Sequence, residues 1–86
     1  MEINKAASAG TLESSDVLVS VKKNSGIKVD IQSDVMEQYG ESIKEIIDKT
    51  LKELDVNNVQ VKVNDKGALD YTIQARLKTA LERASK

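Results

Sequence analysis

The chain has 86 residues, of which 13 are Lys or Arg and 14 are Asp or Glu, so its formal net charge is −1. It contains no Cys and no His, which excludes a thiol nucleophile, a disulfide, an imidazole base and thiolate or imidazole metal ligands. The charges are interspersed, and no apolar run approaches the roughly 18 residues of a membrane span. These features predict one small cytoplasmic domain, with neither a nucleic acid nor a membrane as its partner.

The N-terminal segment, residues 1–15 (MEINKAASAGTLESS), shows neither the alternation of a strand nor the period of a helix. Ile3 and Leu12 are its only branched aliphatic residues. Terminal segments that bury little apolar surface stay mobile. The sequence therefore predicts a flexible N-terminal arm over residues 1–15, followed by a single small α/β domain over residues 16–86.

Three alternating runs indicate strands. Valines or isoleucines occupy every second position over residues 17–22 and again over residues 27–32, which is the pattern of a half-buried strand. Residues 23–26 (KNSG) between them are turn formers, so the pair predicts a β-hairpin. A third such run, residues 59–64 (VQVKVN), predicts another strand.

A first helix is indicated between the second and third strands. Apolar residues over residues 35–54 recur on one face of a helix, and Ser33 or Asp34 could cap it, with Glu37 completing a capping box. Gly40 lies inside this helix, where glycine costs about 1 kcal/mol relative to alanine. A close approach of another backbone, or a local kink, would account for it.

A second amphipathic helix is predicted over about residues 68–84. The order strand, strand, helix, strand, helix indicates an α+β fold, a two-layer α/β sandwich with a three-stranded sheet that two helices cover on one face. The first helix would act as a crossover that leaves the second and third strands parallel. We expect the first strand to lie between these two.

Two serines in residues 10–16 (GTLESSD) are the first functional candidates. Ser14 and Ser15 have acidic neighbours, no histidine anywhere in the chain and no lysine in this segment to activate them. A functional serine here would be the target of another enzyme. The alternative is a plain loop that leads into the first strand.

Carboxylates and a tyrosine are the remaining candidates. Tyr71 falls off the apolar stripe of its helix, which favours an exposed contact, whereas the stripes themselves are expected to be core. Four acids could gather around a hard cation. Acids also favour turns and helix starts, and we therefore expect no metal site. The four acids are Glu13, Asp16, Asp65 and Asp70.

Two blocks of the sequence resemble one family. Residues 7–16 (ASAGTLESSD) are similar to the N-terminus of the acyl carrier subunit, or gamma chain, of citrate lyase. Residues 65–70 (DKGALD), 75–77 (ARL) and 80–84 (ALERA) are similar to the C-terminal half of that family. The blocks keep the family's order, and the resemblance spans essentially the whole chain.

The resemblance implies a covalent prosthetic group, 2'-(5''-phosphoribosyl)-3'-dephospho-CoA, joined by a phosphodiester to one serine of the arm. In the family pattern the serine directly after Leu-Glu carries the group, which here is Ser14. Ser15 is the alternative, at a position that is often glycine in relatives. The residues through which partner enzymes would recognise the arm are Gly10, Thr11, Leu12, Glu13 and Asp16.

The implied function is that of a carrier without catalytic residues. The thiol of the group would hold the acetyl or citryl thioester while other subunits cleave citrate to acetate and oxaloacetate. The implied partners are the acyl-transferase (alpha) and lyase (beta) subunits, the prosthetic-group transferase and the acetylating ligase. Two alternatives stay open, an unmodified adaptor domain that binds a partner protein and the carrier subunit of a related decarboxylase such as malonate decarboxylase.

Overall fold

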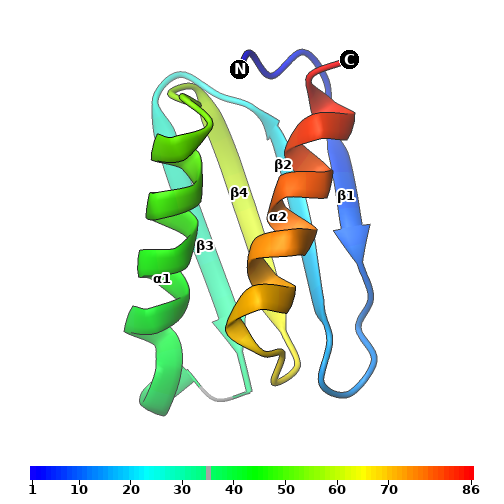
Figure 1. The fold of residues 1–86 in the computed structure, drawn as a ribbon, viewed down its shortest axis with the longest axis vertical. Helices are drawn as coiled ribbons and strands as arrows, with labels where there is room; N and C mark the ends of the chain where they lie inside the picture. The colour runs from blue at the N-terminus through cyan, green and yellow to red at the C-terminus, as the bar shows by residue number, and fades with distance from the viewer. Residues whose placement is uncertain (35) are drawn as a thin grey trace.

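The computed structural model describes residues 1–34 and 36–86, and it describes side chains outside residues 35–40. The two helices lie side by side against one face of a four-stranded mixed sheet (Figure 1). This confirms the predicted α+β class and the order from the second strand onward. The elements are β1 (Ala7–Gly10), β2 (Val17–Lys23), β3 (Ile27–Ser33), α1 (Met36–Glu53), β4 (Val59–Asp65) and α2 (Asp70–Ala84).

The strands lie in the order β1-β2-β4-β3, so β4 separates the two strands of the predicted hairpin. The hairpin, and the expected central place of the first strand, were wrong. The parallel pairing of β3 with β4 is confirmed, and β2 is antiparallel to β4. A strand–helix–strand connection often returns the chain beside the strand that it left. The three valines of β4 are at most 3% exposed, as expected for a central strand.

The sheet has four strands rather than the predicted three because residues 7–10 of the predicted arm form the edge strand β1, antiparallel to β2. Ile3 is only 3% exposed, and Ala9 is also buried. The backbone N–H groups of residues 4–5 donate to the carbonyl oxygen of Ala84 at 2.8 and 3.1 Å. The residues of β1, ASAG, are small and do not alternate between large apolar and polar side chains, so the sequence pattern did not predict this strand.

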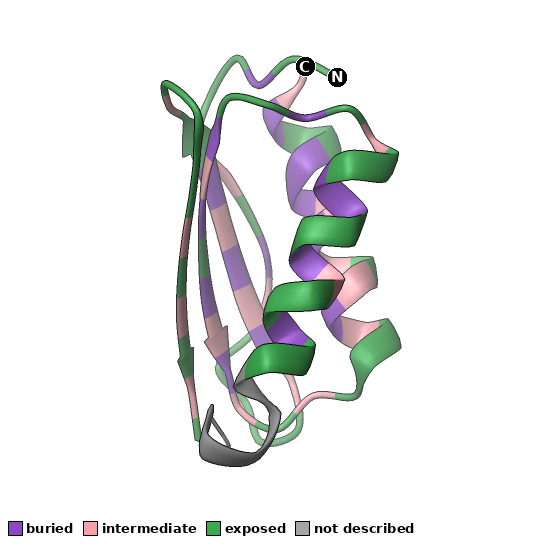
Figure 2. Cartoon of the chain, turned by 90° about the vertical axis from the view of Figure 1, so that its left-hand side faces the viewer, coloured by how far each residue is buried: buried purple, intermediate pink, exposed green. Residues whose placement is uncertain are grey.

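The core fills the space between the helices and the sheet (Figure 2). Neither helix, in the part of the chain described, has the length and apolar content needed to cross a membrane. Glu37, which was predicted to complete a capping box, and Gly40 both belong to residues 35–40, whose side chains the structure does not describe. The buried residues follow the predicted periods: Val17, Val19, Val21, Val59, Val61 and Val63 from the sheet, Ile43, Ile47 and Leu51 from α1, and Ile73, Leu77, Ala80, Leu81 and Ala84 from α2.

Candidate functional site

Ser14 lies in the loop of residues 11–16, which joins β1 to β2 at one end of the sheet (Figure 1). Its side chain is exposed and makes no hydrogen bond to any other residue in the described part of the chain. Ser15 is exposed too, but its φ is 65°. This left-handed conformation costs a residue with a Cβ atom about 1–2 kcal/mol and suits glycine. The two serines therefore differ in their backbones and not in their hydroxyls, which are both exposed and without a hydrogen bond within the described residues. The backbone of Ser15 is held in the left-handed region, whereas that of Ser14 makes no hydrogen bond there.

Gly10 begins the loop in a conformation that only glycine tolerates. Its φ is +96°, and a Cβ atom built there would lie 1.8 Å from the carbonyl oxygen of Val17. The same carbonyl oxygen accepts a hydrogen bond from the backbone N–H of Thr11 at 3.2 Å. The chain can make this close hairpin only because residue 10 has no side chain.

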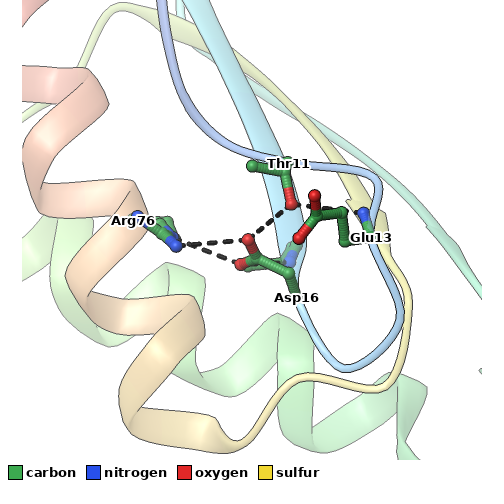
Figure 3. A network of polar contacts seen from close by, with 5 residues as sticks. Thr11, Glu13, Asp16 and Arg76 are labelled. Carbon is green, nitrogen blue, oxygen red and sulfur yellow. Dashed lines mark hydrogen bonds and ion pairs between the residues drawn. The ribbon is translucent and has the colours of Figure 1, made fainter.

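Asp16 closes the loop and ties it to helix α2 (Figure 3). Its Oδ2 accepts hydrogen bonds from the Thr11 hydroxyl at 2.6 Å and from Arg76 Nη2 at 3.1 Å. Its Oδ1 accepts from the N–H of Val17 at 2.7 Å and from Arg76 Nε at 3.2 Å. The Thr11 hydroxyl, then the Val17 N–H and the Arg76 guanidinium, lower the pKa of Asp16 against an opposing effect of burial. Asp16 is therefore ionised at neutral pH.

A second loop, between β4 and α2, supports the first. The N–H of Ser15 donates to the carbonyl oxygen of Lys66 at 2.8 Å, and the N–H of Lys66 donates to the carbonyl oxygen of Asp16 at 2.9 Å. The two loops are thus joined by backbone hydrogen bonds on both sides of Lys66. This arrangement fixes the residue next to Ser14 without involving the Ser14 side chain.

Asp65 anchors the second loop from inside. It is 1% exposed, and its carboxylate accepts hydrogen bonds from the Ser33 hydroxyl at 2.8 Å and from the Ala68 N–H at 2.9 Å. The four acids that the sequence offered as a candidate cluster are engaged separately, since Asp65 is buried and Asp16 pairs with Arg76. Among the residues described, no group of three or more His, Cys, Asp or Glu side chains could hold a metal ion.

The predicted recognition residues divide into two kinds. Gly10, Thr11 and Asp16 build the frame of the loop, whereas Leu12 and Glu13 are exposed, Leu12 by 53%. Sequence reasoning missed Arg76 as a member of the site. It lies in one of the blocks that carry the family resemblance, but no local pattern reveals that it pairs with Asp16, 60 residues away.

The comparisons with known proteins agree with the resemblance. A family model described as ACP, malonate decarboxylase delta subunit (MdcD), matches residues 4–84. The citrate lyase acyl carrier protein of Halothermothrix orenii is 54% identical over 87 residues, which cover 100% of this chain and 93% of that protein. The corresponding protein of Lactobacillus acidophilus is 49% identical over 86 residues, which cover 99% of this chain and 89% of that protein.

The fold is shared with a solved structure at much lower identity. A chain of a Pseudomonas malonate decarboxylase hetero-tetramer in complex with malonate has a TM-score of 0.80 at 15% identity, over 94% of this chain and 84% of that chain. That likeness concerns the fold alone. The identity to the carrier proteins extends over essentially the full length of both partners. The chain therefore belongs to the family of citrate lyase acyl carrier proteins and is a non-catalytic acyl carrier subunit of that lyase.

Proposed function

We propose that the Oγ atom of Ser14 carries phosphoribosyl-dephospho-CoA through a phosphodiester. The observation that carries the proposal is the contrast within the loop of residues 11–16. Thr11 and Asp16 are bonded into the frame, and the backbone of Ser15 is bonded to Lys66. Ser14 makes no hydrogen bond within the described residues from its backbone or its side chain, and its side chain is exposed. The Ser15 hydroxyl is exposed and unbonded there as well, but it stands on a backbone that is fixed in the left-handed region. The hydroxyl of Ser14 can therefore react with a partner without disturbing the fold.

The surroundings of Ser14 fit a group that is tethered rather than enclosed. The neighbouring side chain of Glu13 is exposed and acidic, and the cation of Arg76 is already paired with Asp16. The neighbouring cation of Lys66 also has an acidic partner, because its Nζ lies 3.6 Å from Oδ1 of Asp34. Both of these cations therefore already face a carboxylate of this chain. When attached, the group would supply the thiol that this cysteine-free chain lacks, to hold acetyl or citryl as a thioester.

The chain's own residues would hold the attachment point in place. We propose that residues 11–15, the part of the N-terminal segment 1–15 outside β1, supply the modification site. Residues 16–86, together with β1 and the buried Ile3, make up the folded body. Motion would be confined to the exposed part of the loop, because residues 4–5 are hydrogen-bonded to the end of α2. Tethering raises the effective concentration of a carried thioester at two partner sites. The partners that we propose are the alpha and beta subunits of citrate lyase, the acetylating ligase and the prosthetic-group transferase.

The transferase would have to supply the base for attachment. The chain contains no His or Cys, and no lysine lies among residues 6–21. The carboxylate of Asp16 is paired with Arg76, and that of Glu13 is exposed to solvent. We therefore propose that the proton of the Ser14 hydroxyl passes to a group on the transferase as the Oγ–P bond forms and the bond between that phosphorus and the leaving group of the donor breaks. The carrier contributes position and exposure, which accords with its lack of catalytic residues.

Co-expression with the transferase, followed by intact mass spectrometry, tests the proposal. We expect the wild-type chain to gain the mass of one prosthetic group. The Ser14→Ala variant should gain nothing, and the matched Ser15→Ala variant should still be modified. An adduct that persists in Ser14→Ala, or the absence of any adduct on the wild type, would refute the assignment.

A further inference from the structure

Exposed apolar side chains gather at the end of the molecule that carries Ser14. In the described part of the chain five large hydrophobic side chains are exposed, and three of them lie at this end: Leu12 at 53%, Leu69 at 61% and Tyr71 at 70%. Leu12 belongs to the loop of residues 11–16, Leu69 is the N-cap residue of α2, and Tyr71 lies in the first turn of that helix. The hydrogen bonds of Lys66 join the loop of residues 11–16 to the loop between β4 and α2. We call these three residues the loop-end patch.

Leu69 contributes little to the fold in its position. It is the N-cap residue of α2, with φ −72° and ψ 155°, and its side chain makes no capping hydrogen bond. Ser, Thr, Asp and Asn are preferred at an N-cap, and leucine is among the least favoured residues there. Leu69 therefore neither caps the helix nor is buried. A residue that goes against a local preference, here that for a polar N-cap, without stabilising the fold in return indicates a functional use.

A shallow pocket lies beside the patch and gives it a shape that a partner can enter. Its volume is about 520 Å³, and Ile43 of α1 and Ile73 of α2 form part of its lining together with Leu69 and Tyr71. An apolar pocket edged by an exposed tyrosine is typical of the central region of a protein interface.

The charge around the patch indicates the chemistry of the partner. Glu13 follows Leu12, and Asp70 lies between Leu69 and Tyr71. Both acids are exposed, and neither forms an ion pair within the described residues. Like charges across an interface are unfavourable, so these two carboxylates favour a partner surface that carries Lys or Arg side chains.

We propose that the loop-end patch is the docking surface for the transferase that modifies Ser14. The transferase would place an apolar side chain in the pocket between Ile43 and Tyr71, with Lys or Arg side chains facing Glu13 and Asp70. This inference rests on the proposed function. It adds the start of α2 to the recognition residues that the resemblance implied, all of which lie within residues 10–16, and it gives a partner to Tyr71, which the sequence indicated as an exposed contact.

The test compares single serine substitutions of apolar residues that are all more than half exposed. Leu69→Ser and Tyr71→Ser remove patch side chains, while Ile27→Ser is the matched control. Ile27 is 52% exposed and pairs with Val59, at the other end of the sheet. The attachment rate is measured by intact mass with purified transferase over a range of carrier concentrations. We expect KM for the carrier to rise about tenfold or more for each patch variant, with kcat at saturation retained, and no change for Ile27→Ser.

Three further measurements separate docking from folding and from self-association. Leu69→Ser supplies a preferred N-cap, so its urea midpoint should equal or exceed that of the wild type while its KM rises. Binding of the transferase to a Ser14→Ala carrier, measured by calorimetry, should weaken when Tyr71→Ser is added. Sedimentation equilibrium should show the same mass for the wild type and both patch variants.

Each contrary outcome has a distinct meaning. If the wild type is modified at Ser14 and the patch variants keep the KM of Ile27→Ser, the docking inference is wrong. It is equally wrong if the wild type is a dimer that the patch substitutions dissociate while KM is unchanged. If the wild type is not modified at all, the proposed function fails instead.

Discussion

Gly10 allows the most direct test of how the loop that carries Ser14 is built. A Cβ atom at residue 10 would lie 1.8 Å from the carbonyl oxygen of Val17, and contacts of a Cβ atom below 3.0 Å essentially do not occur. The φ of +96° adds a backbone cost of about 1–2 kcal/mol for a residue with a side chain. Relief of the clash by local movement adds about 1–3 kcal/mol. Gly10→Ala should therefore lower the free energy of unfolding by about 2–5 kcal/mol.

Gly26 is the matched control for this substitution. Its φ is +82°, but a Cβ atom there would meet no heavy atom within 4 Å. Gly26→Ala should therefore lose only the backbone contribution of about 1–2 kcal/mol. The assay is urea unfolding at pH 7 followed by far-ultraviolet circular dichroism. Equal losses for Gly10→Ala and Gly26→Ala would show that the contact with Val17 does not constrain the loop.

Three other predictions concern the loop and the core. The lowered pKa of Asp16 means that its contribution to stability is present above its ordinary pKa of 3.8 and is lost as the pH falls through the folded value. As the pH is lowered, the free energy of unfolding measured in urea should accordingly fall less for Asp16→Asn than for the wild type. An equal fall for both proteins would contradict this. Leu77→Ala removes a side chain that is 0% exposed and should lower the free energy of unfolding by about 2–5 kcal/mol, checked by the same unfolding assay. Ser15→Gly should leave stability unchanged or raise it by up to about 1 kcal/mol, because glycine accepts the φ of 65°, and the chain should still be modified by the transferase.

The helices and three of the four strands follow from local patterns. The helix predicted over about residues 68–84 is α2, Asp70–Ala84, and the alternating valines of β2 and β4 are buried as expected. Strand pairing is not a local property. The turn formers at residues 23–26 suit a hairpin, yet β4 takes the central place, which depends on the packing of the whole sheet. β1 was missed because alanine, serine and glycine carry little hydrophobic signal.

The site was found by its motif and completed only by the structure. The residues GTLESSD drew attention to Ser14, but they could not show that the backbone of Ser15 is left-handed and hydrogen-bonded to Lys66. Nor could they show that Ser14 makes no hydrogen bond within the described residues, from its backbone or from its side chain. The partnership of Arg76 with Asp16 spans 60 residues and follows from the docking of α2 beside β2. The exposed position of Tyr71, by contrast, was already indicated by its place off the apolar stripe.

Localising the prosthetic group on the wild-type chain tests the central claim most directly. Trypsin cleaves after Lys5 and Lys22, so that residues 6–22 form one peptide, whose serines are Ser8, Ser14, Ser15 and Ser20. After co-expression with the transferase, tandem mass spectrometry of this peptide should place the phosphodiester on Ser14 alone. A group found on Ser15, or on a strand serine, would contradict the account.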